Sequence, residues 1–208
     1  AQEAHKIGAW LVHYSTDYVF DGSGNRAWCE TDATEPLSQY GQTKLSGEQA
    51  IQDSGCNYLI FRTSWVYGNR GNNFAQTMLR LASERQTLSV INDQIGAPTS
   101  AALLADCTAH ALHQAICSPE LAGLYHLAAS GQTTWYEYAN LVIEQARTMC
   151  KELLVSEIKP ITTLEYPTAA KRPLNSRLDT SKFCSSFNLV LPEWQHGVIR
   201  MLYETIKK

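Results

Sequence analysis

Residues 8–22 read Gly-Ala-Trp-Leu-Val-His-Tyr-Ser-Thr-Asp-Tyr-Val-Phe-Asp-Gly, and this stretch decides the fold. Its first half, residues 8–15, is a short and nearly continuous apolar run, which is typical of a parallel strand buried on both faces. Polar residues follow at once, and Asp21 and Gly22 mark a loop. A strand of this kind, with polar residues at its carboxyl end, predicts an α/β fold with a ligand site at that edge.

Helical and strand-like segments alternate along the rest of the chain. Helices are predicted at residues 37–54, 74–85, from Ser100 to about 116, at 134–154 and at about 193–207, and strands at 58–63, 88–91 and 123–127. Alternation of this kind favours a mostly parallel sheet with right-handed crossovers. The region beyond Pro160 has no clear periodicity and is predicted to be looser.

The composition excludes several classes of protein. The 208 residues are 44% hydrophobic and 18% charged, and the formal net charge is −3. The basic residues are scattered, which argues against a nucleic-acid partner. No apolar run approaches the ~18 to 20 residues that span a bilayer, and residues 1–6 lack the pattern of a signal peptide. The sequence therefore predicts a cytoplasmic protein with no membrane partner.

The strongest chemical pattern is the pair Tyr40 and Lys44, which lie one turn apart on a predicted helix. The same spacing recurs at Tyr203 and Lys207, which we interpret as a solvated helix face. Tyr40 differs because Thr16 lies 24 residues before it, at the carboxyl end of the first predicted strand. A hydroxyl, a phenol and an ammonium can therefore converge at one edge of the sheet.

These residue types suit proton transfer to a carbonyl oxygen. Free tyrosine has a pKa near ~10, so exchange of its proton near neutral pH requires a neighbouring cation that favours the phenolate. Lys44 is placed to supply that charge.

Together, Thr16, Tyr40 and Lys44 resemble the Ser/Thr, Tyr and Lys triad of the short-chain dehydrogenases. The run Ser15 to Gly22 is similar to that of one extended family among them, the dTDP-4-dehydrorhamnose reductases. Three further stretches resemble the same family: Phe-Arg-Thr-Ser-Trp-Val-Tyr-Gly (61–68), Asn-Asp-Gln-Ile-Gly-Ala-Pro-Thr (92–99) and Arg-Pro-Leu-Asn-Ser (172–176). The resemblance covers essentially the whole chain, and the stretches stand in the family's order.

The resemblance implies a Rossmann-type doubly wound parallel sheet with a smaller substrate-binding α/β region. We expect residues 1–85 to carry the catalytic part of the Rossmann domain and residues 86–208 to form mainly the substrate region, partly returning to the first. The implied reaction is reduction of dTDP-4-dehydro-β-L-rhamnose to dTDP-β-L-rhamnose by NADPH or NADH. Its product would supply O-antigen or other surface polysaccharide, and a homodimer is possible.

The resemblance also implies roles for single residues. Tyr40 would protonate the C4 ketone oxygen, Lys44 would hold the nicotinamide ribose, and Thr16 would hydrogen-bond near the developing alkoxide. Tyr14 would contact the cofactor. Asp17 and Trp65, with Thr16, would contact the deoxysugar, although a tryptophan after a strand is also a common core residue.

Other candidates have ordinary explanations of comparable weight. Asp93 and Gln94 lie in a loop placed to meet the nucleotide end of the substrate, yet this loop also reads as a Gly-Pro turn before a helix cap. Arg172 is the candidate for a phosphate contact, or a solvated loop arginine.

Metal binding has less support. The resemblance also implies magnesium bound by glutamates at a dimer contact. Glu204 matches one of these, but Ala102 stands at the position of a second, which argues against a complete site. Cys107, His110 and His113 have helical spacing, but no fourth ligand is apparent, so we interpret them as an ordinary helix face.

One family feature is absent from the 208 residues. No Gly-x-x-Gly-x-x-Gly run follows a strand, so the backbone cradle for a dinucleotide pyrophosphate is not found here. Together with the first residue, Ala1, this leads us to expect that the chain begins midway through the sheet. On its own it would then be inactive, and its preference for NADH or NADPH is not readable.

Two alternatives remain open. A sugar-nucleotide epimerase or 4,6-dehydratase of the same superfamily uses the same Tyr and Lys. Dehydratases, however, place an acid pair after the Thr, whereas Thr16 is followed by Asp17 and Tyr18. A non-catalytic, reductase-like regulatory subunit is the other alternative, and retention of the complete triad argues against it.

Overall fold

The computed structural model describes residues 1–149, 152–167 and 172–206. The helices are α1 (Gln2–Lys6), α2 (Gln39–Gln52), α3 (Phe74–Glu84), α4 (Ala101–Cys117), α5 (Trp135–Thr148), α6 (Ser181–Phe187) and α7 (Trp194–Ile206), with the 3-10 helices η1 (Asp17–Val19), η2 (Pro119–Leu121) and η3 (Thr163–Glu165). The strands are β1 (Trp10–Thr16), β2 (Asn57–Thr63), β3 (Val66–Tyr67), β4 (Thr87–Ile91), β5 (Ile95–Gly96), β6 (Thr99–Ser100), β7 (Gly123–His126), β8 (Thr133–Thr134) and β9 (Glu157–Ile161).

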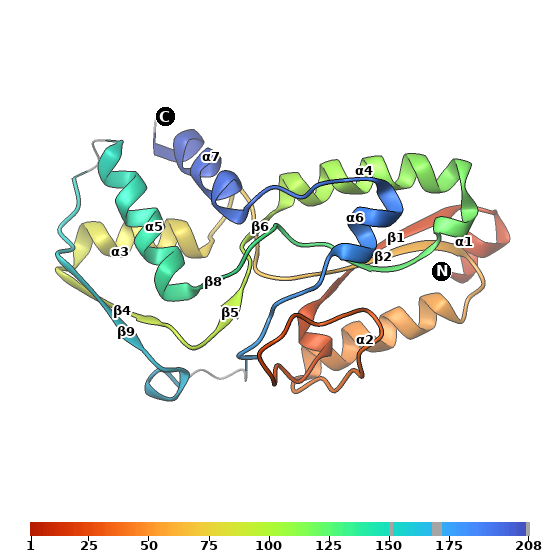
Figure 1. Ribbon diagram of the computed structural model, residues 1–208, viewed down its shortest axis with the longest axis horizontal. Coiled ribbons are helices and arrows are strands. Elements are labelled where there is room, and N and C mark those ends of the chain that lie inside the picture. Colours follow the sequence, from red (N-terminus) through yellow and green to blue (C-terminus); the bar gives the residue numbers. More distant parts are fainter. Residues whose placement is uncertain (150–151, 168–171, 207–208) are drawn as a thin grey trace.

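The main sheet has three parallel strands in the order β1-β2-β7, which confirms the predicted α/β fold. Thr16 is in register with Thr63, and Arg62 with His126, so the carboxyl ends of the strands meet at one edge. The short pairs β3-β6 and β5-β8 follow at that edge and lead to the second part of the molecule (Figure 1).

Helices cover both faces of this sheet. Successive side chains of β2 point to opposite sides, so neighbouring residues of this strand pack against different helices. On one face, Phe61 packs with Leu104 of α4 and Phe183 of α6. On the other, Ile60 packs with Ile51 of α2, close to α1. Helices on both faces are the arrangement of a doubly wound sheet.

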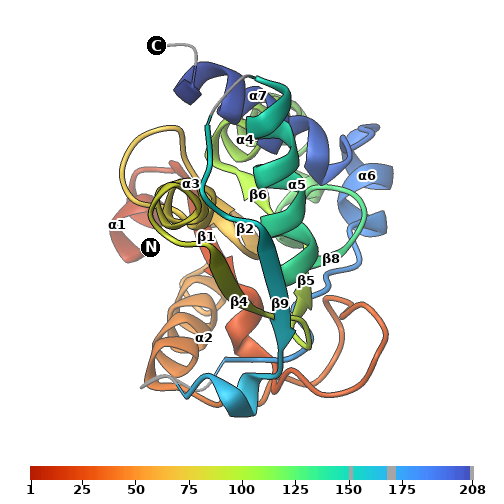
Figure 2. The ribbon, with the colours of Figure 1, turned by 90° about the vertical axis from the view of Figure 1, so that its left-hand side faces the viewer.

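A second core joins α3, α5 and α7 to the parallel pair β4-β9, whose two strands lie side by side in Figure 2. Met78, Tyr138 and Val198 are buried there, one from each helix. Helix α3 contributes to this core although it precedes residue 85, whereas α4, β7 and α6 return to the first sheet. The division at residue 85 stays a prediction.

Three sequence predictions differ from the structure. The helix expected at residues 134–154 ends at Thr148, and β9 (Glu157–Ile161) forms where no strand was predicted. Pro160 argued against a strand in the sequence, because proline cannot donate a ladder hydrogen bond. The proline is tolerated because, among the described strands, β9 pairs only with β4 and keeps a free edge. Strand β1 was predicted to be buried on both faces. It is an edge strand of the described sheet, and of its residues only Ser15 and Thr16 are buried.

Helix α2 is fixed to the sheet by a buried ion pair. The Arg62 guanidinium donates to both carboxylate oxygens of Glu48, with distances of 2.6 to 3.2 Å, and the two residues are 4% and 1% exposed. Nearby His126 is also buried. Its burial, followed by the Arg62 charge, lowers its pKa to about 3, so the imidazole stays neutral beside the ion pair. Glu48 lies one helical turn beyond Lys44, so the pair also sets where the catalytic candidates of α2 stand.

Among the described residues, no helix combines the length and apolarity needed to cross a bilayer.

Candidate active site

Thr16 ends β1 at the carboxyl edge of the sheet, where its side chain is buried. Its hydroxyl oxygen accepts from the backbone N–H of Tyr18 at 3.2 Å and so caps η1. The hydroxyl also donates to Asp17 Oδ1 at 3.1 Å. The chain thus turns sharply after the strand and holds the Thr16 hydroxyl in a defined orientation.

Tyr40 and Lys44 stand beside this turn because α2 begins close to it. Ser38 caps the helix by accepting from the Gly41 N–H at 3.2 Å. The Tyr40 ring is 52% exposed and lies edge-on to Tyr18, with ring centroids 5.7 Å apart. Lys44 Nζ donates to the Tyr14 carbonyl oxygen at 2.8 Å. Both side chains are therefore anchored to residues within two positions of Thr16.

Gly41 allows α2 to pack closely against the turn at Tyr18, since a Cβ added at Gly41 would overlap the Tyr18 carbonyl oxygen and crowd Pro36. We expect Gly41→Ala to lower the free energy of unfolding by about 1 to 3 kcal/mol, measured by urea denaturation. Gly47→Ala on the same helix is the matched control. Its Cβ would meet its nearest neighbour, His13 Nε2, at 3.8 Å, so it should be neutral or stabilising by up to ~1 kcal/mol. Equal stability of the two variants would contradict this packing.

Tyr14 is the residue expected to contact a cofactor. Its ring is partly exposed, and its hydroxyl lies 2.6 Å from the Thr108 hydroxyl of α4. The phenol oxygen is therefore engaged on the α4 side of the sheet, while the Tyr14 carbonyl holds Lys44.

Asp17 carries the most perturbed carboxyl of the site. It is 2% exposed, and burial raises its pKa to about 7, against opposing hydrogen bonds from Ser176 and Thr16. The pKa of neighbouring Tyr18 is also raised, mainly by burial and then by Asp17, while the Arg172 guanidinium opposes that rise. The charged and titratable groups at this turn thus include Arg172, which is exposed and close enough to act on Tyr18.

The raised pKa has a consequence for stability. Folded Asp17 keeps its proton up to about pH 7, whereas the unfolded carboxyl releases it near its ordinary value of 3.8, so the folded state binds more protons in between. Wild-type stability should therefore fall as the pH rises through this window. We expect Asp17→Asn to gain stability over wild type by on the order of 2 kcal/mol between pH 4 and 7, in urea denaturation at several pH values.

Asp179→Asn provides a control of opposite sign. The pKa of Asp179 is lowered by hydrogen bonds from Ser181, so its contribution to stability is present above its ordinary pKa and is lost as the pH falls. That variant should lose stability relative to wild type as the pH rises. Parallel curves for the two variants would contradict the assignment of Asp17.

Trp65 follows β2 at the same edge and has a strained backbone, with a φ of 48°. Its indole is half-buried and stacks on Trp135, the first residue of α5, with ring centroids 3.7 Å apart. Gly96 leaves the necessary room, because a Cβ there would lie 2.6 Å from the indole. A strained aromatic residue held against a second indole is typical of a functional site.

Asp93 and Gln94 are engaged within the protein. Both carboxylate oxygens of Asp93 accept from the backbone N–H of Thr163 at 2.9 Å. Buried Gln94 accepts from Trp135 Nε1 at 3.0 Å and donates to the Thr163 hydroxyl at 3.1 Å. Gln94 therefore lies beside the Trp65–Trp135 stack, and Asp93 holds η3 in place.

The segment 172–176 packs against the turn that follows β1. Gly22 packs under Pro173, since a Cβ at Gly22 would overlap the proline ring. Asn175 N–H donates to the Gly22 carbonyl at 3.0 Å, and Ser176 reaches Asp17. The structure thus brings Thr16, Asp17, Tyr40, Lys44 and Arg172 to one region.

Glu204 lies elsewhere, on α7. It accepts from Arg200 Nε at 3.2 Å and from the Asn69 side-chain amide. No group of three or more potential metal-ligating residues is found within residues 1–149, 152–167 and 172–206. Cys107 is buried with a pKa raised to about 11 by burial, whereas His110 and His113 are exposed, so the three side chains lie in different environments on α4.

Sequence reasoning missed Trp135, Thr163 and Ser176 as members of this region. Trp135 has a local signal, since Thr134 and Glu137 form a capping box that places it at the start of α5. Thr163 and Ser176 reach the site only through contacts distant in sequence, for which the sequence has no periodic pattern.

The whole described chain is similar to known proteins. Residues 1–206 match the family model described as RmlD substrate binding domain. A relative from Escherichia coli (strain K12), named dTDP-4-dehydrorhamnose reductase, is 61% identical over 204 residues, which are 98% of this chain and 68% of the relative. A dTDP-4-dehydrorhamnose reductase structure from Bacillus anthracis, in complex with NADP, has a TM-score of 0.85 at 36% identity and covers 97% of this chain and 68% of that one. The fold is shared with a UDP-N-acetylglucosamine 4-epimerase from Bacillus cereus, which matches 97% of this chain and 67% of that one with a TM-score of 0.74 at 18% identity.

Proposed function

The chain belongs to the RmlD substrate binding domain family, and we propose that it supplies the catalytic and substrate-binding part of a dTDP-4-dehydrorhamnose reductase. The reaction is reduction of the C4 ketone of dTDP-4-dehydro-β-L-rhamnose to give dTDP-β-L-rhamnose. The observation that carries the proposal is the convergence of Tyr40, Lys44 and Thr16 at the carboxyl edge of the sheet.

NADPH or NADH is the cofactor, as NADP is in the complex of the Bacillus anthracis protein. When bound, it supplies the hydride. Exposed Tyr40 and the Lys44 ammonium fit its nicotinamide ribose, because Lys44 spends one of its three N–H groups on Tyr14 and keeps two. The 208 residues contain no Gly-x-x-Gly-x-x-Gly run, so we assign none of them to the pyrophosphate.

Tyr40 donates its phenolic proton to the ketone oxygen as the carbon is reduced, and the resulting phenolate is stabilised by the Lys44 charge. Thr16 contacts the same oxygen. In the present arrangement its hydroxyl hydrogen is given to Asp17 Oδ1, so the hydroxyl must turn away from Asp17 to donate to the substrate. Trp65 offers a flat apolar surface to the deoxysugar.

The polar groups around this centre bind the remainder of the substrate. Arg172 is exposed next to Tyr18 and has the guanidinium fork that suits a diphosphate. Gln94 and Asp93 act mainly by holding Trp135 and η3, and through them the Trp65 surface. Glu204 is paired with Arg200 and Asn69, and we assign it no magnesium.

The test is an assay of the full-length protein with dTDP-4-dehydro-β-L-rhamnose and either reduced cofactor. We expect one reduced cofactor to be consumed for each dTDP-β-L-rhamnose formed. An epimerase or dehydratase would interconvert or dehydrate a sugar nucleotide with no net cofactor consumption, and a regulatory subunit would turn over none of these substrates. Either result would overturn the proposal.

We further propose that the product supplies O-antigen or another surface polysaccharide. Loss of the gene should then remove rhamnose from the lipopolysaccharide, as measured by sugar analysis of the purified material.

A further inference from the structure

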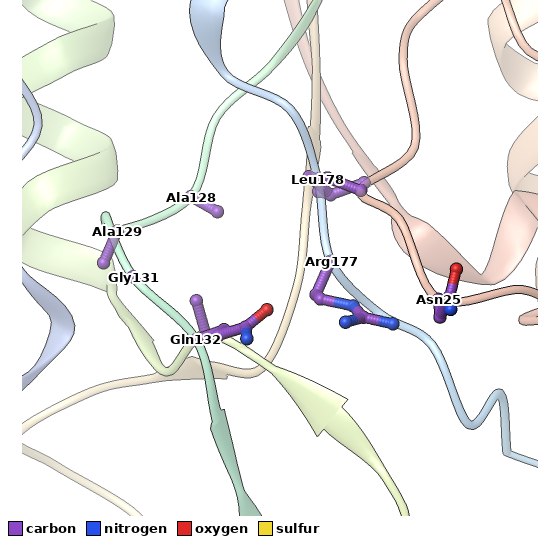
Figure 3. A pocket seen from close by; sticks show the side chains of 9 residues that line it. Asn25, Ala128, Ala129, Gly131, Gln132, Arg177 and Leu178 are labelled. Carbon is purple, nitrogen blue, oxygen red and sulfur yellow. The ribbon is translucent and has the colours of Figure 1, made fainter.

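A cavity of about 300 Å³ is formed by segments that adjoin the candidate active site. It is bounded by the loop after η1, the turn between β7 and β8, and residues 177–178, as Figure 3 shows. Its lining residues are Asn25, Ala27, Ala97, Ala128, Ala129, Gly131, Gln132, Arg177 and Leu178. None of them is a candidate catalytic, cofactor or sugar residue, so this cavity needs a separate explanation.

The polar groups of the lining are all able to donate hydrogen bonds. They are the Arg177 guanidinium and the side-chain amides of Asn25 and Gln132, and in Figure 3 the three project into the same space. No carboxylate is among the lining residues, although the Glu193 carboxylate lies against Gly131 behind one wall. Within the described residues, Arg177 makes no ion pair, and the amides of Asn25 and Gln132 have no hydrogen-bond partner. The cavity therefore holds the partly exposed Arg177 guanidinium beside two exposed side-chain amides, each with N–H groups that are not used within the protein.

Asn175 holds Arg177 in this position. Its side chain is 2% exposed, and Oδ1 accepts from Arg177 Nε at 2.8 Å and from the Arg177 backbone N–H at 3.3 Å. Asn175 Nδ2 donates in turn to the carbonyl oxygens of Ser23 and Arg26 at 3.1 and 2.8 Å. The guanidinium is thus fixed through one N–H, and the four N–H groups of its terminal nitrogens remain available.

Small side chains leave the room that a ligand needs. Ala27, Ala97, Ala128 and Ala129 and Gly131 line most of the remaining wall. A volume of about 300 Å³ is enough to hold a phosphate group. A preorganised guanidinium flanked by amides matches the oxygens of such an anion, with two bound by the fork.

We propose that this cavity is a phosphate-binding site, with Arg177 as the principal ligand and Asn25 and Gln132 as supporting donors. A bound phosphate would link the loop after η1 to the turn after β7. These two segments are brought together only in the folded protein, so phosphate binding should stabilise the folded state. The site does not depend on the proposed reductase activity.

The test measures binding of inorganic phosphate by calorimetric titration and thermal shift, at constant ionic strength set with chloride. We expect saturable binding, a rise in melting temperature, and at least tenfold weaker binding by Arg177→Gln. Arg200→Gln, which removes an exposed arginine of α7, is the matched control and should bind phosphate like wild type. A phosphate monoester measured in parallel distinguishes the source, since tighter binding of the ester identifies an esterified ligand and equal binding the free ion.

Asn25→Asp supplies an independent variant should Arg177→Gln fail to fold. It places a carboxylate in the cavity at nearly unchanged volume, and it should abolish phosphate binding through repulsion. Arg172→Gln separates this cavity from the active site and should leave phosphate binding unchanged. Absence of saturable binding by wild type, unaltered binding by Asn25→Asp, or loss of binding on Arg172→Gln instead would each overturn the proposal.

Discussion

Tyr40→Phe should lower the turnover of the full-length reductase by about two to four orders of magnitude, because it removes the proposed proton donor while keeping the ring. The ring contact with Tyr18 and the Gly41 approach involve no phenolic oxygen, so the fold around α2 should persist. Steady-state kinetics with the dTDP-sugar should show the loss in kcat, with little change in KM.

Tyr203→Phe on α7 is the matched control, since it removes a phenol from a partly exposed tyrosine that has the same spacing to a lysine in the sequence. Lys207 lies outside the described residues. We expect the control to retain activity within a factor of a few. Near-normal turnover by Tyr40→Phe, or a comparable loss in the control, would mean that the wrong tyrosine was chosen.

Arg62→Leu should lower the free energy of unfolding by about 3 to 5 kcal/mol, measured by urea denaturation at pH 7. The substitution leaves the Glu48 carboxylate almost fully buried without a countercharge, and such a group costs far more than the ion pair contributed. It also removes the cation that lies 5.1 Å from the centre of the Phe20 ring. Helix α2 should loosen, and activity should fall with it.

The double variant Glu48→Leu with Arg62→Met tests the cause. Replacing both charges by apolar groups of similar volume should restore much of the loss, because no unpaired charge remains. Arg80→Leu is a control for the loss of a surface pair, and it should cost less than about 1 kcal/mol because Arg80 and Glu84 are both exposed. A double variant as unstable as Arg62→Leu alone would show that packing, and not the unpaired charge, dominates.

The alternation of strands and helices was predictable from the sequence because burial imposes a period on each element. Residues 58–63 and 74–85, for example, agree with β2 and α3 to within one residue at each end. Ser100 was identified as a helix cap, and its side chain accepts from the Leu103 N–H at 3.1 Å. Such signals are local, and local signals are what a single sequence carries.

The features that escaped prediction depend on contacts between distant residues. Strand β9 exists because β4 offers it hydrogen bonds across some 70 residues, which outweighs the unfavourable Pro160. The raised pKa of Asp17 is caused by burial beneath the turn and is opposed by a hydrogen bond from Ser176, and the residues next to Asp17 in the sequence indicate neither effect. Similarly, the free charge of Arg177 is evident only once Asn175 is seen to hold it.

The stacked indoles of Trp65 and Trp135 give this protein an internal optical reporter. With ring centroids 3.7 Å apart and planes within 14° of parallel, the two chromophores are close enough for their electronic transitions to mix. Their near-ultraviolet circular dichroism should therefore contain a paired signal of opposite signs. A ligand that moves Trp65 changes that signal directly, so occupancy of the proposed sugar site can be followed without a label or a coupled reaction.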